Sequence, residues 1–274
     1  MVLWSTGFVG AKLGLPYAEP ATFLVLRFGL VLALLLPICL VLRAPWPSRQ
    51  GVWHMLVAGV LLQAGYLGGV FAAIHHGMPA GISALITGLQ PLSTALLGGW
   101  LLKEQVTARQ WGGLVLGLIG VLLVVGERMT MSSGMGGLSI ALACMALLSI
   151  TLGTIWQKRH GAGVDLRTGA ALQYMAAAVV LAPFALLLET REVRWSGEFV
   201  FAIFWLAIVL SLGAVFLLLF LIRQGAATRV ASLFYLVPPT TALMAWPLFG
   251  ETYSFVSAFG MGLAMLAVWL VTSK

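Results

Sequence analysis

Residues 81–125 read GISALITGLQPLSTALLGGWLLKEQVTARQWGGLVLGLIGVLLVV, and this stretch decides the fold. It consists of an apolar run broken by Pro91, a short charged turn that contains Glu104, and a second apolar run rich in glycine. A shift of 147 residues places Pro91 on Pro238 and Glu104 on Glu251, with small residues again on small residues beyond them. A period close to half the chain length indicates two copies of one unit.

The rest of the first half repeats at nearly the same distance. A shift of 146 residues places Pro37 on Pro183 and aligns several glycine, lysine and aromatic positions. We therefore expect a duplicated chain, with a first repeat over residues 1–126 and a second over residues 138–272.

The composition predicts that the protein lies in a membrane. Of 274 residues, 61% are hydrophobic and 8% are charged, whereas roughly 25% are charged in a typical soluble domain. A soluble globule has too little interior for so much apolar surface, so the lipid bilayer is the expected partner. The net charge of +7 does not indicate nucleic-acid binding, because the loops are too short for basic clusters or stacking surfaces.

Ten apolar segments follow one another along the chain, and most approach the ~20 residues that a helix needs to cross the hydrocarbon layer. These segments are continuously apolar and do not alternate apolar with polar residues, which favours helices over barrel strands. The first segment is short, so we expect the natural chain to have residues before Met1. The expected spans are 2–14, 20–42, 52–74, 79–102, 110–126, 138–157, 167–188, 199–222, 229–249 and 254–272.

The positive charges orient these helices. With the N-terminus in the cytoplasm, ten Lys or Arg residues fall on the inner side and three on the outer side. The inner set is Arg43, Arg49, Lys103, Arg109, Lys158, Arg159, Arg167, Arg223, Arg229 and Lys274, and the outer set is Arg128, Arg191 and Arg194. An excess of positive charge is typical of cytoplasmic loops, so both termini are expected there. Because five helices per repeat is an odd number, the second repeat must be inverted, as in alternating-access transporters.

Four motifs carry a family resemblance: LWSTGFVGAK at 3–12, PYAEPATFLVLRF at 16–28, and the paired block ends LLKE at 101–104 and LFGE at 248–251. They resemble the EamA-type branch of the drug/metabolite transporter superfamily, and within it the YddG-type amino-acid exporters of the bacterial inner membrane. The resemblance implies an all-α fold of ten transmembrane helices in an inverted five-plus-five repeat. It also implies a central cavity between helices one to four and six to nine, with helices five and ten outside.

Polar and aromatic side chains within the spans are the candidate substrate-binding residues. Unpaired amides and tyrosine hydroxyls are costly in hydrocarbon, so these side chains are expected to face the cavity, with helix packing as the alternative for hydroxyls. The candidates are Trp4, Gln63, Tyr66, Gln90, Thr154 and Tyr235. Pro91 and Pro238 are expected to kink their helices, because each removes a backbone donor; these kinks either border the cavity or are purely architectural.

Two cations lie within membrane depth. Lys12 is near the outer end of its helix and is expected to extend to the lipid headgroups. Arg27 lies seven residues beyond Pro20, deep enough to need a partner. It either binds a substrate carboxylate or pairs structurally with Glu19 or backbone carbonyls.

The acidic residues argue against strong proton coupling, because every Asp and Glu falls at the end of a span or in a loop. A carboxylate at mid-membrane is the usual proton relay of coupled transporters, so facilitated export is the simpler inference. The sequence contains no phosphate-binding loop and no recognisable catalytic constellation. The pair His75 and His76 has no third ligand at a suitable spacing, so neither a metal nor another cofactor is expected.

We therefore expect an inner-membrane exporter of amino acids and related small metabolites, not an enzyme. The alternatives are a proton-coupled drug/metabolite antiporter, a lipid flippase that uses the same cavity, or an integral-membrane enzyme. Small residues on the fifth and tenth helices, such as Gly117 with Gly120 and Gly260 with Ala264, predict close packing. That packing is either within one protomer or between two.

Overall fold

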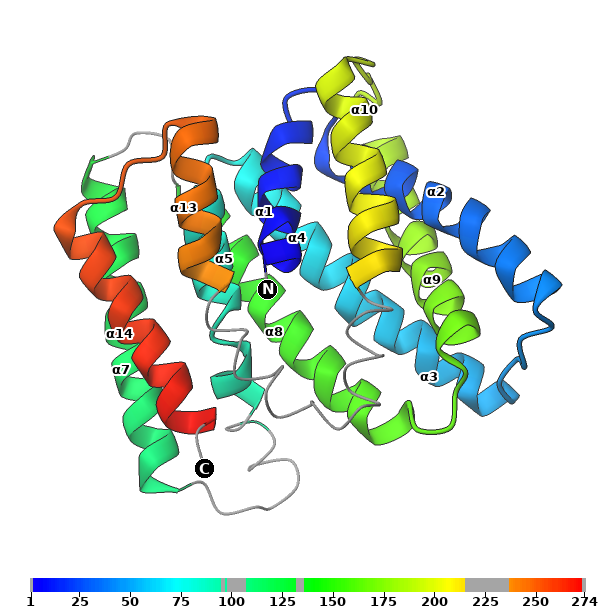
Figure 1. Cartoon of the computed structure of the whole chain (residues 1–274), viewed down its shortest axis with the longest axis horizontal. Helices are drawn as coiled ribbons and strands as arrows, with labels where there is room; N and C mark the ends of the chain where they lie inside the picture. The colour runs from blue at the N-terminus through cyan, green and yellow to red at the C-terminus, as the bar shows by residue number, and fades with distance from the viewer. Residues whose placement is uncertain (1, 95–96, 98–106, 132–135, 215–236, 273–274) are drawn as a thin grey trace.

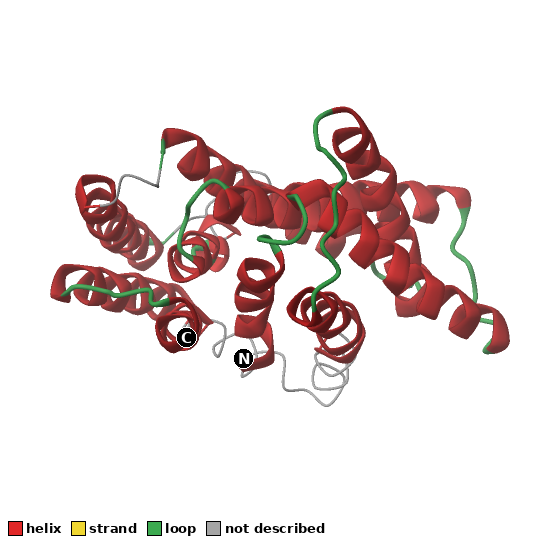
Figure 2. Ribbon diagram, turned by 90° about the horizontal axis from the view of Figure 1, so that it is seen from above, coloured by secondary structure: helices red, strands yellow, loops and turns green. Residues whose placement is uncertain are grey.

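The structure is a computed structural model that describes residues 2–94, 97, 107–131, 136–214 and 237–272. Within these ranges the chain forms helices joined by short connections, and it contains no strand (Figures 1 and 2). The all-helical prediction is therefore confirmed for the described chain.

The helices of the first half include one long rod that contains a π-helical segment. In order they are α1 (Val2–Gly14), α2 (Pro20–Val41), α3 (Arg49–Gly59), the π segment η1 (Val60–Gly65), α4 (Tyr66–His75), α5 (Ala80–Thr87) and α7 (Ala108–Met131). The second half also contains a π segment. Its elements are α8 (Gly137–His160), α9 (Leu166–Leu187), α10 (Gly197–Phe204), the π segment η2 (Trp205–Ala214), α13 (Val237–Phe249) and α14 (Phe255–Thr272).

Among the described helices, four are long and apolar enough to cross a membrane: 20–41, 49–75, 137–160 and 166–187. The exposed large side chains are also apolar, as at Leu187, which is 80% exposed. Such a surface matches lipid rather than water, so the protein is a membrane protein.

Several helix limits differ from the expected spans. The third expected span, 52–74, is longer and runs without a break from Arg49 to His75. The fourth, 79–102, is interrupted: α5 ends at Thr87, and the chain turns before helix resumes at Gln90. The physical cause is local, since Pro91 cannot donate to a carbonyl in the preceding turn.

The core is formed by aromatic side chains from both halves of the chain. α2 packs against α9, α3 packs against α8 and α9, and α4 packs against α8. The Phe23 ring meets the Phe71 ring edge-on at 5.3 Å between centroids, and the Phe28 ring lies 5.5 Å from that of Tyr174. These contacts fix the position of α2 between α4 and α9, where it borders the cavity described below.

α7 and α14 form a pair at one side of the molecule (Figures 1 and 2). A Cβ atom placed on Gly120 would lie 2.5 Å from the carbonyl oxygen of Gly260, and one on Gly260 would lie 2.6 Å from that of Gly120. Only glycine permits so close an approach of two backbones. The small faces predicted from the sequence therefore pack against each other within one chain.

The expectation for Lys12 was wrong. Its ammonium group forms an ion pair with Glu251 instead of extending alone to the headgroups. The Glu251 carboxylate is almost fully buried and also accepts hydrogen bonds from the Ala80 backbone N–H and the Tyr253 hydroxyl. This Lys12–Glu251 cluster joins the end of α1, the start of α5 and the loop between α13 and α14.

Candidate functional site

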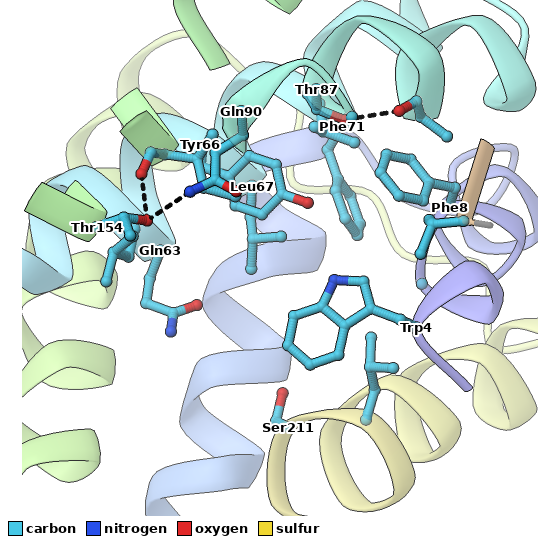
Figure 3. Close-up of a pocket in the computed structure, with 18 of the residues that line it drawn as sticks. Trp4, Phe8, Gln63, Tyr66, Leu67, Phe71, Thr87, Gln90, Thr154 and Ser211 are labelled. Atoms are coloured by element: carbon cyan, nitrogen blue, oxygen red, sulfur yellow. Dashed lines mark hydrogen bonds between the residues drawn. The ribbon is translucent and has the colours of Figure 1, made fainter. Parts of the chain in front are cut away.

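A central cavity of about 440 Å³ lies among the helices and receives side chains from both halves of the chain (Figure 3). Its volume falls in the range of about 300–1,000 Å³ that is usual for small-molecule sites. The lining residues are Trp4, Gly7, Phe8, Arg27, Leu62, Gln63, Tyr66, Leu67, Val70, Phe71, Ala84, Thr87, Gly88, Gln90, Pro91, Ile150, Thr154, Tyr174, Leu210, Ser211 and Val237.

Six of the predicted substrate-binding residues line this one cavity, although they come from five different elements and from a helical turn after α5. They are Trp4, Arg27, Gln63, Tyr66, Gln90 and Thr154. The seventh, Tyr235, lies outside the described residues. Their proximity is a finding of the structure, and their roles in binding stay predictions.

The two prolines differ in position. Pro91 lines the cavity directly after the turn at Gly88 and Leu89. Pro238 is the second residue of α13 and packs near Gly88, while its neighbour Val237 reaches the cavity. Any kink before Pro238 would involve residues outside the described part of the chain.

The two π-helical segments lie at equivalent positions of the two halves. Shifting η1 by the 146-residue offset of the sequence gives residues 206–211, which fall inside η2. η1 presents Leu62 and Gln63 to the cavity, and η2 presents Leu210 and Ser211. π turns are rare and are found frequently at functional sites, so this correspondence favours the cavity as the functional region.

Amides and hydroxyls from both halves meet on one wall. The Gln90 Nε2 atom donates to the Thr154 hydroxyl at 3.2 Å, a hydrogen bond that joins the turn after α5 to α8. The Thr154 hydroxyl in turn donates to the Ile150 carbonyl at 2.7 Å. Gln63 forms no hydrogen bond with the described residues, and Figure 3 shows its amide beside the same space as Trp4. Polar contacts for a solute are thus available on this wall.

Arg27 is the single charged side chain among the described lining residues, and it is 3% exposed. Its Nη2 atom donates to the Ser211 hydroxyl at 2.9 Å, and that hydroxyl donates to the Leu206 carbonyl at 2.9 Å. Its Nε atom is buried and has no hydrogen-bond partner in the described part of the chain. The expected alternative, a pair with Glu19, is not formed, because the Glu19 carboxylate accepts from the Thr190 backbone and hydroxyl at 2.6 Å.

Several lining residues were missed by the sequence prediction. Phe8 and Phe71 look like ordinary core residues in an apolar helix. Tyr174 aligns with the apolar residue Phe28 in the 146-residue repeat and was not chosen as a candidate. Ser211 carried a usable signal, because it is a polar residue near the middle of an apolar segment. Its contact with Arg27 spans 184 positions and needs a three-dimensional structure to be seen.

The arrangement is suited to binding rather than to chemical conversion. Amides, hydroxyls and a guanidinium can orient a small polar molecule, while aromatic rings such as those of Trp4 and Tyr66 enclose its apolar part. The described lining contains no carboxylate, histidine or cysteine, the groups that transfer protons or hold metals.

The family model described as the EamA-like transporter family matches residues 1–126 and again residues 137–273. The chain belongs to the EamA-like transporter family. This family lies within the drug/metabolite transporter superfamily, as the motif resemblance indicated. The protein is therefore a membrane transporter.

Relatives of the chain are also named as transporters or efflux pumps. The chain is 27% identical over 284 residues to a "Probable amino-acid metabolite efflux pump" of Salmonella typhimurium, which covers 98% of this chain and 91% of that protein. It is 26% identical over 272 residues to an "Uncharacterized inner membrane transporter YedA" of Escherichia coli, with coverage of 99% and 87%. A solved crystal structure superposes with a TM-score of 0.64 at 21% identity over 98% of this chain and 92% of that one, a likeness of fold alone.

Proposed function

We propose that this protein exports amino acids and related small metabolites across the bacterial inner membrane by alternating access through the central cavity. The observation that carries the proposal is the cavity itself, which both halves line and to which the equivalent π segments contribute. An inverted five-plus-five repeat, divided between residues 126 and 138, would let the two halves rock about this site. The name of the Salmonella typhimurium relative, an amino-acid metabolite efflux pump, supports the same class of cargo.

We propose that this transport is facilitative and that both termini lie in the cytoplasm. The support for facilitation is the absence of a carboxylate among the described lining residues, since a proton relay needs a titratable group near the cargo. The support for the orientation is the distribution of Lys and Arg between the loops.

Reconstitution tests this function. The purified protein in proteoliposomes should carry radiolabelled amino acids down their gradients, and exchange them, at equal pH on both sides. A proton gradient alone should not drive accumulation. No flux of any amino acid or small metabolite would refute the proposal, and movement of a labelled lipid in its place would assign a flippase.

A matched pair of variants links the flux to the cavity. Leu67→Trp adds bulk to the cavity wall, whereas Leu122→Trp makes the same change on the exposed face of α7. Transport should fall strongly in the first variant and stay near wild type in the second at equal protein per vesicle. Equal activity of the two variants would show that cargo takes another route.

A further inference from the structure

The guanidinium of Arg27 is a buried cation with too few partners. An arginine side chain has five N–H donors and stays charged in proteins. In the described part of the chain, Nη2 donates one hydrogen bond, to the Ser211 hydroxyl, and the buried Nε–H has no acceptor. Leaving such a group unpaired within a membrane is costly, so its position calls for an anion that the described part of the chain does not supply.

Four carboxylates in the described part of the chain have partners other than Arg27. Glu189 accepts from the Ala21 and Thr22 backbone at 2.7 Å, and Glu251 pairs with Lys12. Asp165 pairs with Arg167 at 2.8 Å, and Glu19 accepts from Thr190. In the described part of the chain, therefore, no acidic side chain neutralises Arg27.

The same cavity offers a weak environment for an ammonium group. The described lining supplies neutral acceptors, such as the side-chain oxygens of Gln63 and Gln90, but no anionic one. A bound α-amino group would exchange water for these acceptors without gaining an ion pair, so it would add little to affinity. A carboxylate, in contrast, would gain a charge-assisted and bidentate partner in Arg27.

We propose that Arg27 is the carboxylate-binding residue of the cavity, and that the cargo class is organic monocarboxylates with an uncharged body whose amino group is dispensable. This inference rests on the proposed transport function. The carboxylate accepts hydrogen bonds from Nε and Nη2 of Arg27, and Ser211 holds the guanidinium toward it from the other half of the chain. The apolar body lies against the aromatic wall of Trp4, Phe8 and Phe71. A 2-oxo acid with the skeleton of an amino acid is therefore carried about as well as the amino acid itself.

Competition in proteoliposomes tests the cargo class. Counterflow of radiolabelled leucine is measured against leucine, 4-methyl-2-oxopentanoate and leucinamide, which share one skeleton. The oxo acid should compete within about threefold of leucine, and leucinamide should be at least tenfold weaker, about the loss of 1.4 kcal/mol of binding free energy. Leucinamide that competes as well as leucine, or an oxo acid that fails to compete, overturns the inference. In both cases leucine flux persists, so the proposed function stands separately.

Thermal stability distinguishes a binding role of Arg27 from a structural one. Because Arg27→Met removes an uncompensated buried charge, the ligand-free variant should melt at or above the wild-type temperature. It should also lose the upward shift that leucine and the oxo acid cause in the wild type. Arg27→Lys keeps the charge without the planar fork and should weaken competition at least tenfold. A markedly lower melting temperature of Arg27→Met, with the ligand shift retained, would make Arg27 structural and overturn the proposal.

Two controls complete the test. Arg49→Met makes the same change at an exposed position at the start of α3 and should keep both the flux and the ligand shift. Measurements in chloride and in chloride-free sulfate buffer examine an inorganic occupant. Stabilisation of the wild type by chloride alone, with no effect of either carboxylate, would overturn the assignment.

Discussion

The Lys12–Glu251 cluster gives the sharpest prediction about stability. The Glu251 side chain is 5% exposed and that of Lys12 is 27% exposed, so the pair is mostly shielded from water. Removing one partner of a fully buried pair costs about 3–5 kcal/mol. Because Lys12 retains some contact with solvent, we expect Glu251→Gln to cost about 2 kcal/mol, near the value of a hydrogen bond to a charged group.

The opposite variant should be worse. Lys12→Met leaves the more deeply buried carboxylate without its cation, so its cost should approach the lower limit of the fully buried range, about 3 kcal/mol. The double variant Lys12→Met, Glu251→Gln removes both charges and should recover at least ~1 kcal/mol relative to the sum of the single changes, as contacting residues do.

The assay is the apparent melting temperature of purified protein in detergent. At ~2–4 °C per kcal/mol for a chain of this size class, Glu251→Gln should melt several degrees below the wild type. Asp165→Asn is the matched control, because its ion pair with Arg167 is more exposed, and it should lower the melting temperature less. Strictly additive effects in the double variant would refute the reasoning.

Four further outcomes follow from the described contacts. Gly120→Ala should destabilise the α7–α14 pair, because its Cβ would lie 2.5 Å from a Gly260 backbone oxygen, whereas Gly112→Ala, with nothing within 4 Å, should be tolerated in the same melting assay. Burial raises the pKa of Glu251, but hydrogen bonds from Lys12, Tyr253 and the Ala80 backbone outweigh it and lower that pKa overall. The stability from this carboxylate is therefore present above its unfolded value of about 4.3 and is lost as pH falls through the lower folded value, a loss that Glu251→Gln should not show. Gln90→Leu removes an amide beside the cavity and should weaken cargo affinity roughly tenfold to a hundredfold. In the same flux assay, Pro91→Ala should change the transport rate more than the affinity. If Gln90→Leu has no effect on transport, Gln90 does not belong to the site. Cysteines introduced beside Arg159 should react only with reagents on the cytoplasmic side and those beside Arg194 only from outside, and labelling of both from one side would contradict the inverted topology.

Local patterns predicted the helices well. Continuous apolar runs and short loops predicted the limits of α2 to within one residue: the helix is Pro20–Val41, and the expected span was 20–42. The glycines of the fifth expected span predicted a face for close helix packing, and the structure places that face against Gly260 of the same chain. These features depend on neighbours in the sequence and on the bilayer as solvent.

Features that depend on distant residues were less predictable. The Lys12–Glu251 pair joins positions 239 residues apart, so the sequence alone favoured an isolated lysine at the membrane surface. Six residues chosen from the sequence as candidates line one cavity, because a polar side chain in hydrocarbon needs an explanation, and their roles in binding stay predictions. Two members of the cavity's aromatic wall, Phe8 and Phe71, were missed, because phenylalanines occur on any buried helix face.

The two π segments bring different side chains to one cavity. η1 and η2 occupy equivalent positions, and each interrupts a regular helix beside the cavity. η1 brings the Gln63 amide, and η2 brings the Ser211 hydroxyl that holds Arg27. The backbone geometry is thus shared, while the side chains that the two segments bring to the cavity differ. Under the proposed transport function, a cargo with a carboxylate at one end would have one favoured orientation, set by Arg27.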